Sequence, residues 1–330
     1  MLAITNKFSK SLFDYIFYMA QRYKIFTWPA HQQYLFELAQ GDFDFYIPAG
    51  QNASFTQQFS TQKNVTEVDL SMIKNLDFDL ILFQDEESYQ TGQFKILSEQ
   101  QRQLPKVYLE HHPPKQHPTN AKHFVEDADV QLVYTNYYNA LMWDNNQLKV
   151  SVIENGVPVS AISFSGENAQ GVVVLEEFPA DGRVTGADIF RQVKEALPIA
   201  VVRIGEDGVS YQNLAEKISG YRFLFCPDRY ASPQFSIFKA MMLGMPVAGL
   251  ATTALPTIIE NEVSGFVHSD LNYLIGKMQT LINDAQLAIQ MGGKAHGQAS
   301  GSFSSNRFLS EWNRFFTHTI AGNLAVLTRI

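Results

Sequence analysis

The sequence is poor in cysteine and in positive charge. Cys226 is the single cysteine among 330 residues, so an intrachain disulfide is impossible and a cysteine-rich metal site is excluded. It lies in the apolar run YRFLFC, which predicts a buried strand residue instead of a nucleophile. The formal net charge is -8. Because nucleic acids and anionic membranes are bound through basic surface, we expect no nucleic-acid partner.

Long hydrophobic runs are missing too. The nearest candidate, residues 11–23, is interrupted by Asp14 and Arg22 and is too short to span a bilayer. We predict that it packs on the first domain as an N-terminal extension, with peripheral membrane contact as the alternative. No secretory segment is recognisable. The expected location is therefore cytoplasmic, with membrane association at most peripheral.

Several well-defined catalytic motifs are absent. The sequence has no P-loop, no dinucleotide-binding glycine fingerprint, no nucleophile elbow and no metalloprotease helix. Four histidines do fall within 13 residues, but their spacing matches no standard zinc motif. These are His111, His112, His117 and His123. We therefore predict no metal site.

What the sequence does contain is material for two domains. A chain of 330 residues, 45% hydrophobic, exceeds the size at which one core usually suffices. Strand-like and helix-like runs alternate, which is typical of parallel sheets built from βα units. Strands are expected at 24–28, 43–47, 78–83, 105–110, 130–135, 149–154, 171–177, 199–205, 221–226, 246–251 and 264–268. Helices are expected at 31–40, 89–103, 119–127, 136–144, 186–196, 211–218, 234–243, 270–283 and 284–299.

Residues 155–171 are rich in small and turn-forming residues and are interpreted as a linker. The predicted domains are 1–160 and 161–305, with a C-terminal helix over 306–330 that returns to the first domain. Aromatic residues stand at helical spacing along this tail and predict core packing. They are Phe308, Trp312, Phe315 and Phe316.

The most informative stretch is FSIFKAMMLGMPVAGLATTALPTIIENEVSGFV, residues 235–267. Its apolar residues recur at helical spacing, Gly244 can end the helix in a left-handed conformation, and Pro246 forbids its continuation. The following run PVAGLA is apolar enough for a buried strand. It ends at Thr252 and Thr253, so their hydroxyls and amides are predicted to lie at the carboxyl edge of a sheet, where α/β proteins bind ligands.

This stretch resembles the donor-sugar half of family 4 glycosyltransferases of the GT-B fold, whose pattern reads roughly E-A-M-A-x-G-x-P-V, a short loop, and L-P-x-I-I-x-x-x-x-x-G. The resemblance covers about 150 residues of the C-terminal half. It implies an α/β architecture of two Rossmann-like domains facing across a cleft. It also implies transfer of a sugar from a nucleotide-sugar donor, without a metal and without a further cofactor.

Two glutamates of that family pattern are replaced in this chain, by Ala231 and Lys239. A lysine ammonium only donates hydrogen bonds, so Lys239 is predicted to contact donor phosphate or a nearby acid such as Glu176 or Glu177. Two phosphate-binding cations of the family are missing after the first strand of the second domain. Arg183 is the nearest base and the predicted substitute.

Ser232 followed by Pro233 is predicted to cap the helix over 234–243 and to direct its N-terminus at the donor diphosphate. In the first domain, His111 directly follows a strand, where the resemblance implies an imidazole that contacts the transferred sugar. Plain loop packing is the alternative interpretation. His31 and Gln32 follow the first strand and are the candidates for the acceptor side.

The sequence thus predicts a glycosyltransferase that acts on an unknown acceptor, which is a saccharide, a lipid-linked glycan or a protein. One alternative is a catalytically degenerate GT-B protein that binds a nucleotide sugar or a glycan. A further alternative is another GT-B enzyme, such as a sugar-nucleotide epimerase or a phosphorylase. The sequence names neither the nucleotide nor the sugar.

Overall fold

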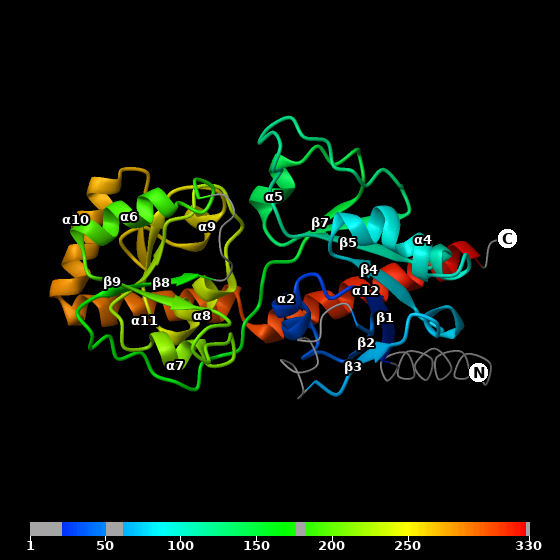
Figure 1. Cartoon of the computed structure of the whole chain (residues 1–330), viewed down its shortest axis with the longest axis horizontal. Helices are drawn as coiled ribbons and strands as arrows, with labels where there is room; N and C mark the ends of the chain where they lie inside the picture. Colours follow the sequence, from blue (N-terminus) through cyan, green and yellow to red (C-terminus); the bar gives the residue numbers. More distant parts are fainter. Residues whose placement is uncertain (1–21, 51–61, 176–181, 328–330) are drawn as a thin grey trace, which may run out of the picture. The chain divides into compact units, whose positions relative to one another are not determined.

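The computed structural model describes residues 22–50, 62–175 and 182–327, and the side chains up to residue 322. Within these residues the chain forms two separate parallel sheets, each accompanied by helices (Figure 1). Strands up to Val152 belong to one sheet and strands from Gly171 onward belong to the other. The α/β fold class predicted from the sequence is therefore confirmed.

The first sheet has seven strands in the order β3-β2-β1-β4-β5-β6-β7. The sequence predicts all of them except β3, an edge strand whose two middle residues are polar and exposed, so that it lacks an apolar run. The bounds are β1 Tyr23–Thr27, β2 Phe43–Pro48, β3 Val65–Val68, β4 Leu80–Phe83, β5 Lys106–Glu110, β6 Val130–Tyr134 and β7 Val150–Val152.

Two helix predictions in this region need correction: the one over 89–103 is too long, and the one over 119–127 is wrong. The segment 89–103 is broken into a π-turn, Ser88–Gly92, the short helix α4, Gln93–Ile96, and a 3-10 turn, Gln101–Gln103. The break occurs because Leu97 is extended, and the Gln101 side-chain amide donates to the carbonyls of Ile73 and Leu76 at 2.7 and 2.8 Å. Side chains that bond to backbone groups compete here with the helix.

The segment 119–127, in contrast, contains no helix. The Asn146 amide donates to the carbonyls of His123 and Val125, and the backbone amide of His123 donates to Asp144. These partners replace the bonds that a helix would make within the segment. The helices predicted on either side do form, as α2, Gln32–Leu38, and α5, Tyr137–Met142.

The second sheet has five strands in the order β12-β11-β10-β8-β9. Its strands are β8 Gly171–Leu175, β9 Ile199–Arg203, β10 Leu224–Cys226, β11 Val247–Leu250 and β12 Gly265–His268. The accompanying helices are α6 Ala187–Ala196, α7 Leu214–Ile218, α8 Phe235–Leu243, α9 Leu255–Ile258, α10 Leu271–Asn283, α11 Ala285–Ser302 and α12 Ser305–Leu327. The short α9 is the helix of this part that the sequence does not predict. Cys226 is buried on β10, as expected.

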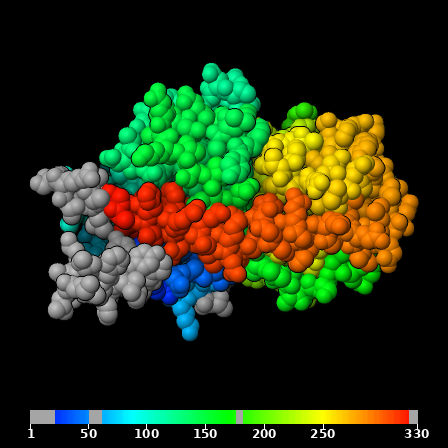
Figure 2. All heavy atoms as spheres, turned by 180° about the vertical axis from the view of Figure 1, so that it is seen from behind, coloured from blue at the N-terminus to red at the C-terminus, as the bar shows by residue number. Residues whose placement is uncertain are grey.

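Helix α8 ends as its sequence predicts. Gly244 has φ 90° and stands at the C-terminal cap, and the strand β11 follows almost at once. Gly292 of α11 lies so close to this cap that a Cβ there would be 1.8 Å from the Gly244 carbonyl oxygen. Glycine at both positions therefore lets the two helix backbones touch. Figure 2 shows the orange residues of α10 and α11 on the outside of this part of the molecule.

The connection between the two sheets is fixed by the start of α12. Gly156 packs so tightly on Phe308 that a Cβ would lie 2.3 Å from the Phe308 Cβ, and Arg307 donates to the carbonyls of Glu154 and Asn155 at 2.7 and 2.8 Å. The aromatic stripe of the tail is core packing, as predicted: Phe308, Trp312 and Phe316 are fully buried.

By compactness the described chain divides into two units. The first contains the residues up to Val107 and those from Phe316, and the second is Tyr108–Phe315. Within the first unit the Phe316 ring packs edge-on against Phe43. The domain boundaries after residues 160 and 305 stay a prediction. Among the described helices, none has the length and apolar character needed to cross a membrane.

Candidate functional site

The second sheet has a topological switch point between β8 and β10. From β8 the chain moves to one side to form β9 and then to the other side to form β10. Open α/β sheets bind ligands at the carboxyl ends of the strands at such a point, because the two loops there diverge. The loops in question are residues 182–186, which lead into α6, and residues 227–234, which lead into α8.

Gly186 brings these two loops into direct contact. It opens α6 with φ 70°, and a Cβ at this position would lie 1.9 Å from the Pro227 carbonyl oxygen. Both the left-handed conformation and the short distance require glycine. The loops are further joined because the backbone amides of Arg229 and Tyr230 donate to the Val184 carbonyl at 2.9 and 3.2 Å.

An ion-pair network connects the same loops. The Arg229 guanidinium forms a fork with the Asp188 carboxylate, with N···O distances of 2.5 and 2.7 Å. Arg183 contacts the same carboxylate at 3.7 Å and its side chain is 79% exposed. The Arg229 hydrogen bond, assisted by the backbone amides of Asp188 and Ile189, holds the pKa of Asp188 well below its usual range. The Asp188 carboxylate thus interacts with two arginines and with backbone amides in the first turn of α6.

The hydroxyls of Thr252 and Thr253 hold the loop 227–234 in place. They donate to the carbonyls of Asp228 and Ala231, both at 2.9 Å. Thr253 has φ 48°, an uncommon conformation for a β-branched residue. The two side chains that were predicted to face the donor thus donate their hydroxyl hydrogen bonds to this loop.

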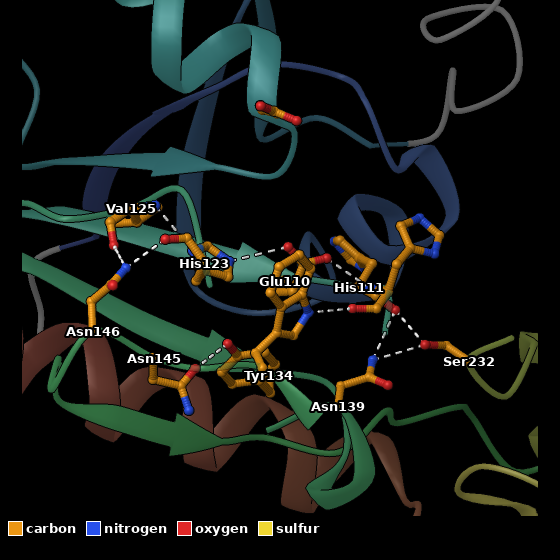
Figure 3. Close-up of polar contacts among 12 residues, drawn as sticks. Glu110, His111, His123, Val125, Tyr134, Asn139, Asn145, Asn146 and Ser232 are labelled. Carbon is orange, nitrogen blue, oxygen red and sulfur yellow. Dashed lines mark hydrogen bonds and ion pairs between the residues drawn. The ribbon is translucent and has the colours of Figure 1, made fainter. Parts of the chain in front are cut away.

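Ser232 does not cap α8, contrary to the sequence prediction. The helix begins at Phe235 with Gln234 at the N-cap, and no side chain caps it. The Ser232 hydroxyl instead donates to the His111 carbonyl and accepts a hydrogen bond of 2.8 Å from the Asn139 amide (Figure 3). The capping interpretation fails because a capping oxygen accepts from a backbone amide of the first turn, whereas α8 begins three residues after Ser232 and the Ser232 oxygen accepts from Asn139.

His111 follows β5, as predicted, and is buried. Its carbonyl also accepts from Asn139 at 3.1 Å, and Asn139 stands in the first turn of α5, where its backbone amide donates to the N-cap Asn136. The next carbonyl, that of His112, accepts from the Trp143 indole at 2.9 Å. The loop after β5 is thus held by two side chains from α5 and the residue directly after it.

A buried pair fixes the base of this loop. Glu110 accepts from the His112 backbone amide at 2.8 Å and lies 3.2 Å from His123 Nε2 (Figure 3). The Val125 backbone amide donates to His123 Nδ1 at 3.1 Å. Because that nitrogen accepts, the ring is neutral and carries its proton on Nε2, toward Glu110. Burial, followed by the Glu110 charge, raises the pKa of the neighbouring Tyr134.

The first sheet has its own switch point, between β1 and β4. At their carboxyl ends the buried side chains of Thr27 and Gln84 meet at 3.3 Å. His31 and Gln32 lie just beyond β1, at the N-cap and the first position of α2. Their placement at this edge agrees with a ligand-facing position, and their acceptor role stays a prediction.

The remaining predictions divide as follows. The structure brings Ser232 to the backbone of His111, and it gathers Arg183, Thr252 and Thr253 around the loops of the second sheet. Lys239 lies on α8 and is partly exposed, and its predicted partners Glu176 and Glu177 fall outside the described residues. The extension over 11–23 lies largely outside them as well.

The sequence interpretation misses three residues of this site: Asp188, Arg229 and Asn139. Arg229 is 41 residues from its partner Asp188, and Asn139 is 93 residues from its partner Ser232, so no local sequence pattern reveals these contacts. In the part of the chain that the structure describes, no three His, Cys, Asp or Glu side chains are placed to hold a metal ion.

Comparisons with known proteins bear on the fold. No protein-family model matches the sequence, and no curated protein sequence matches it either. Anabaena HepE in complex with UDP-glucose is similar with a TM-score of 0.65 at 15% identity, over 92% of this chain and 100% of HepE. Sucrose-phosphate synthase from Thermosynechococcus elongatus is similar with a TM-score of 0.68 at 12% identity, over 91% and 100% of the two chains.

The pneumococcal O-GlcNAc transferase GtfA, in complex with UDP and GlcNAc, has a TM-score of 0.59 at 13% identity, over 76% of this chain and 59% of GtfA. At these identities the likeness concerns the fold. The chain has the two-sheet α/β fold of GT-B glycosyltransferases, as the sequence predicts. Membership of family 4 stays a prediction.

Proposed function

We propose that this protein is a glycosyltransferase that transfers a sugar from a uridine diphosphate sugar to an acceptor. The observation that carries the proposal is the cluster of anion-binding groups at the switch point of the second sheet. Arg183, Arg229 and the amides at the start of α6 all face one carboxylate, that of Asp188. Such donors also suit the oxygens of a diphosphate.

The two arginines have different roles in this proposal. Arg229 has two guanidinium nitrogens on Asp188 and one of them also on the Arg183 carbonyl, at 3.0 Å, so it holds the loops together. Arg183 is mostly exposed and its side chain contacts Asp188 at a distance of 3.7 Å, so it can turn to a phosphate at small cost. We therefore assign Arg183 to the donor diphosphate and Arg229 to the positioning of its loop.

The chemistry follows from these positions. As the bond between sugar and diphosphate breaks, negative charge grows on the leaving nucleotide, and preorganised donors stabilise it. Our proposal needs no metal ion and no cofactor for this step. His111 acts on the sugar side, where a buried imidazole on a fixed loop can hydrogen-bond the group that is transferred. His31 and Gln32 stand on the acceptor side, and the acceptor is a saccharide, a lipid-linked glycan or a protein.

The comparisons support the choice of nucleotide. HepE binds UDP-glucose, and GtfA is an O-GlcNAc transferase that binds UDP and GlcNAc. These are properties of proteins with the same fold and low identity, so they guide the choice of probes. UDP, UDP-glucose and UDP-N-acetylglucosamine are the ligands to test first, with GDP as the control nucleotide.

Isothermal titration with UDP, together with an assay of UDP release from the nucleotide sugar, tests the proposal. Arg183→Ala should weaken UDP binding, whereas Arg191→Ala, which removes one exposed charge from the helix that follows the Arg183 loop, should not. His111→Ala should lower turnover on the order of 10²-fold, about 2.7 kcal/mol, and leave UDP affinity nearly unchanged.

The possible results separate the candidate functions. No UDP binding by the intact protein would contradict the proposal. Binding of a nucleotide sugar without any turnover would favour the alternative of a binding module. Ala231 and Lys239, which occupy the two glutamate positions of the resembling family, are consistent with that alternative. Equal and small effects of His111→Ala on binding and turnover would make His111 a packing residue.

A further inference from the structure

Three polar groups form a closed triangle beside His111. The Ser232 hydroxyl donates to the His111 carbonyl, and the Asn139 amide nitrogen donates both to that carbonyl, at 3.1 Å, and to the Ser232 oxygen, at 2.8 Å. Figure 3 shows Ser232 reaching this pair from its own loop. The hydroxyl thus sits between one fixed acceptor and one fixed donor. This is the environment that a protein offers to a sugar hydroxyl, which also donates once and accepts.

The orientation of Asn139 is fixed by this triangle. The His111 carbonyl can only accept, so the amide nitrogen must face it and the amide oxygen must point away. Asn139 is 1% exposed, and its amide oxygen has no hydrogen-bond partner among the described residues. A buried acceptor without a donor costs free energy, so a group that supplies a hydrogen there would bind favourably.

The loop that carries Ser232 contains a second buried polar atom without a hydrogen-bond partner among the described residues. The Tyr230 hydroxyl is buried and has no partner among the described residues, and its ring lies edge-on to Tyr138 of α5. Two unsatisfied groups, one acceptor and one donor, therefore occur where α5 meets the loop 227–234. Native interiors leave few such groups, and their pairing here suggests a place where a polar ligand completes the network.

We propose that the Ser232 hydroxyl is an internal substitute for a hydroxyl of the donor sugar. In this inference, which rests on the proposed function, the His111 carbonyl and the Asn139 amide nitrogen bind one sugar hydroxyl when Ser232 withdraws. The Asn139 amide oxygen then accepts from an adjacent hydroxyl. An amide presents a donor and an acceptor side by side, so the group recognised is a pair of neighbouring hydroxyls on a neutral hexose.

The exchange is feasible because one hydroxyl replaces another. Withdrawal of Ser232 breaks its two hydrogen bonds, and the sugar hydroxyl forms the same two again. The rest of the loop stays anchored, because the carbonyls of Asp228 and Ala231 are held by the two threonines that follow β11. Ser232 therefore competes with the sugar and does not compete with the nucleotide. Asn139 has the opposite effect, because it favours binding of the sugar.

The test is the ratio of two affinities, measured by isothermal titration on the full chain. The ligands are UDP and whichever of UDP-glucose and UDP-N-acetylglucosamine binds the unaltered protein more tightly. Ser232→Ala should raise the affinity for the nucleotide sugar relative to UDP by about five-fold, the effect of one competing hydrogen bond. Asn139→Ala should lower the same ratio by about ten-fold.

Ser300→Ala is the control, because it removes a partly buried serine hydroxyl that bonds within α11 and to Met242. It should leave the ratio unchanged, and a thermal melt shows that each variant is folded. If UDP binds and neither Ser232→Ala nor Asn139→Ala changes the ratio, the inference is wrong while the proposed function stands. If neither UDP nor a nucleotide sugar binds the unaltered protein, both fall together.

Discussion

Replacement of Gly186 by alanine probes the contact that joins the two loops of the candidate site. The residue has φ 70°, which costs an alanine about 1–2 kcal/mol. In addition, the new Cβ would lie 1.9 Å from the Pro227 carbonyl oxygen, where ordinary contact begins at 3.4 Å. Relief of such an overlap against backbone atoms typically costs a further 1–3 kcal/mol, roughly. We expect a loss of about 2–5 kcal/mol in the free energy of unfolding.

Thermal unfolding measures this loss, and two other glycines serve as controls. For a unit of this size, 1 kcal/mol lowers the melting temperature by about 2–4 °C, so Gly186→Ala should lower it by roughly 4–20 °C. Gly205 also has positive φ, 87°, but nothing lies within 4 Å of its Cβ position, so Gly205→Ala carries the conformational cost alone. Gly276 is helical with open space around it, and Gly276→Ala should stabilise the protein slightly.

The same variant links stability to ligand binding. If the Pro227 carbonyl has to withdraw, the Arg229 fork on Asp188 is strained and the Arg183 loop loses its support. UDP affinity should therefore fall in Gly186→Ala and persist in Gly205→Ala. Equal melting temperatures for these two variants would refute the close contact between the loops, and with it the argument that Gly186 positions the site.

Three further outcomes follow from the structure. Gly292→Ala should destabilise the protein by about 1–3 kcal/mol, because its Cβ would strike the carbonyl that ends α8, whereas adjacent Gly293→Ala meets open space and should not, as chemical denaturation would show. The Arg229 hydrogen bond lowers the pKa of Asp188, so the ionised carboxylate stabilises the fold above about pH 4 and this stabilisation is lost as the pH falls. In Asp188→Asn the free energy of unfolding should therefore depend less on pH in the acid range. Burial raises the pKa of Tyr230 to about 12, so ionisation of this hydroxyl makes the protein less stable as the pH rises from about 10 to about 12. Tyr230→Phe should remove this alkaline loss and, by removing an unpaired hydroxyl, stabilise the protein by about 1 kcal/mol at neutral pH. A less stable Tyr230→Phe would show that the hydroxyl has a partner in solution.

Most of the fold is predictable because buried parallel strands have an unmistakable sequence. Apolar runs identify every strand except β3, whose two middle residues are polar and exposed. Helices are predictable where an apolar face repeats, as in α8 and α12. The prediction fails over 119–127, where Asn146 satisfies backbone groups that a helix would otherwise pair. Hydrogen bonds between a side chain and a remote backbone leave no periodic trace.

The site is predictable only in part, for the same reason. The sequence places His111 and Thr252 at strand ends, because strand ends are themselves predictable. It does not find Arg229 or Asn139, whose function depends on Asp188 and Ser232 lying within hydrogen-bond distance after folding. Gly186 is the available signal for this arrangement, since a glycine that opens a helix after a strand often marks a close approach of two backbones.

The direction of the hydroxyl protons decides which groups can bind a diphosphate. Ser232, Thr252 and Thr253 all donate to carbonyls of the protein, so toward a ligand their oxygens can only accept. An ionised diphosphate has no hydrogen to give and requires donors. The positive charge of the site must then come from guanidinium, ammonium and backbone amide groups. Arg183 is a largely exposed cation beside the switch point, and the hydroxyl side chains instead shape the loop that, in our proposal, lies against the donor.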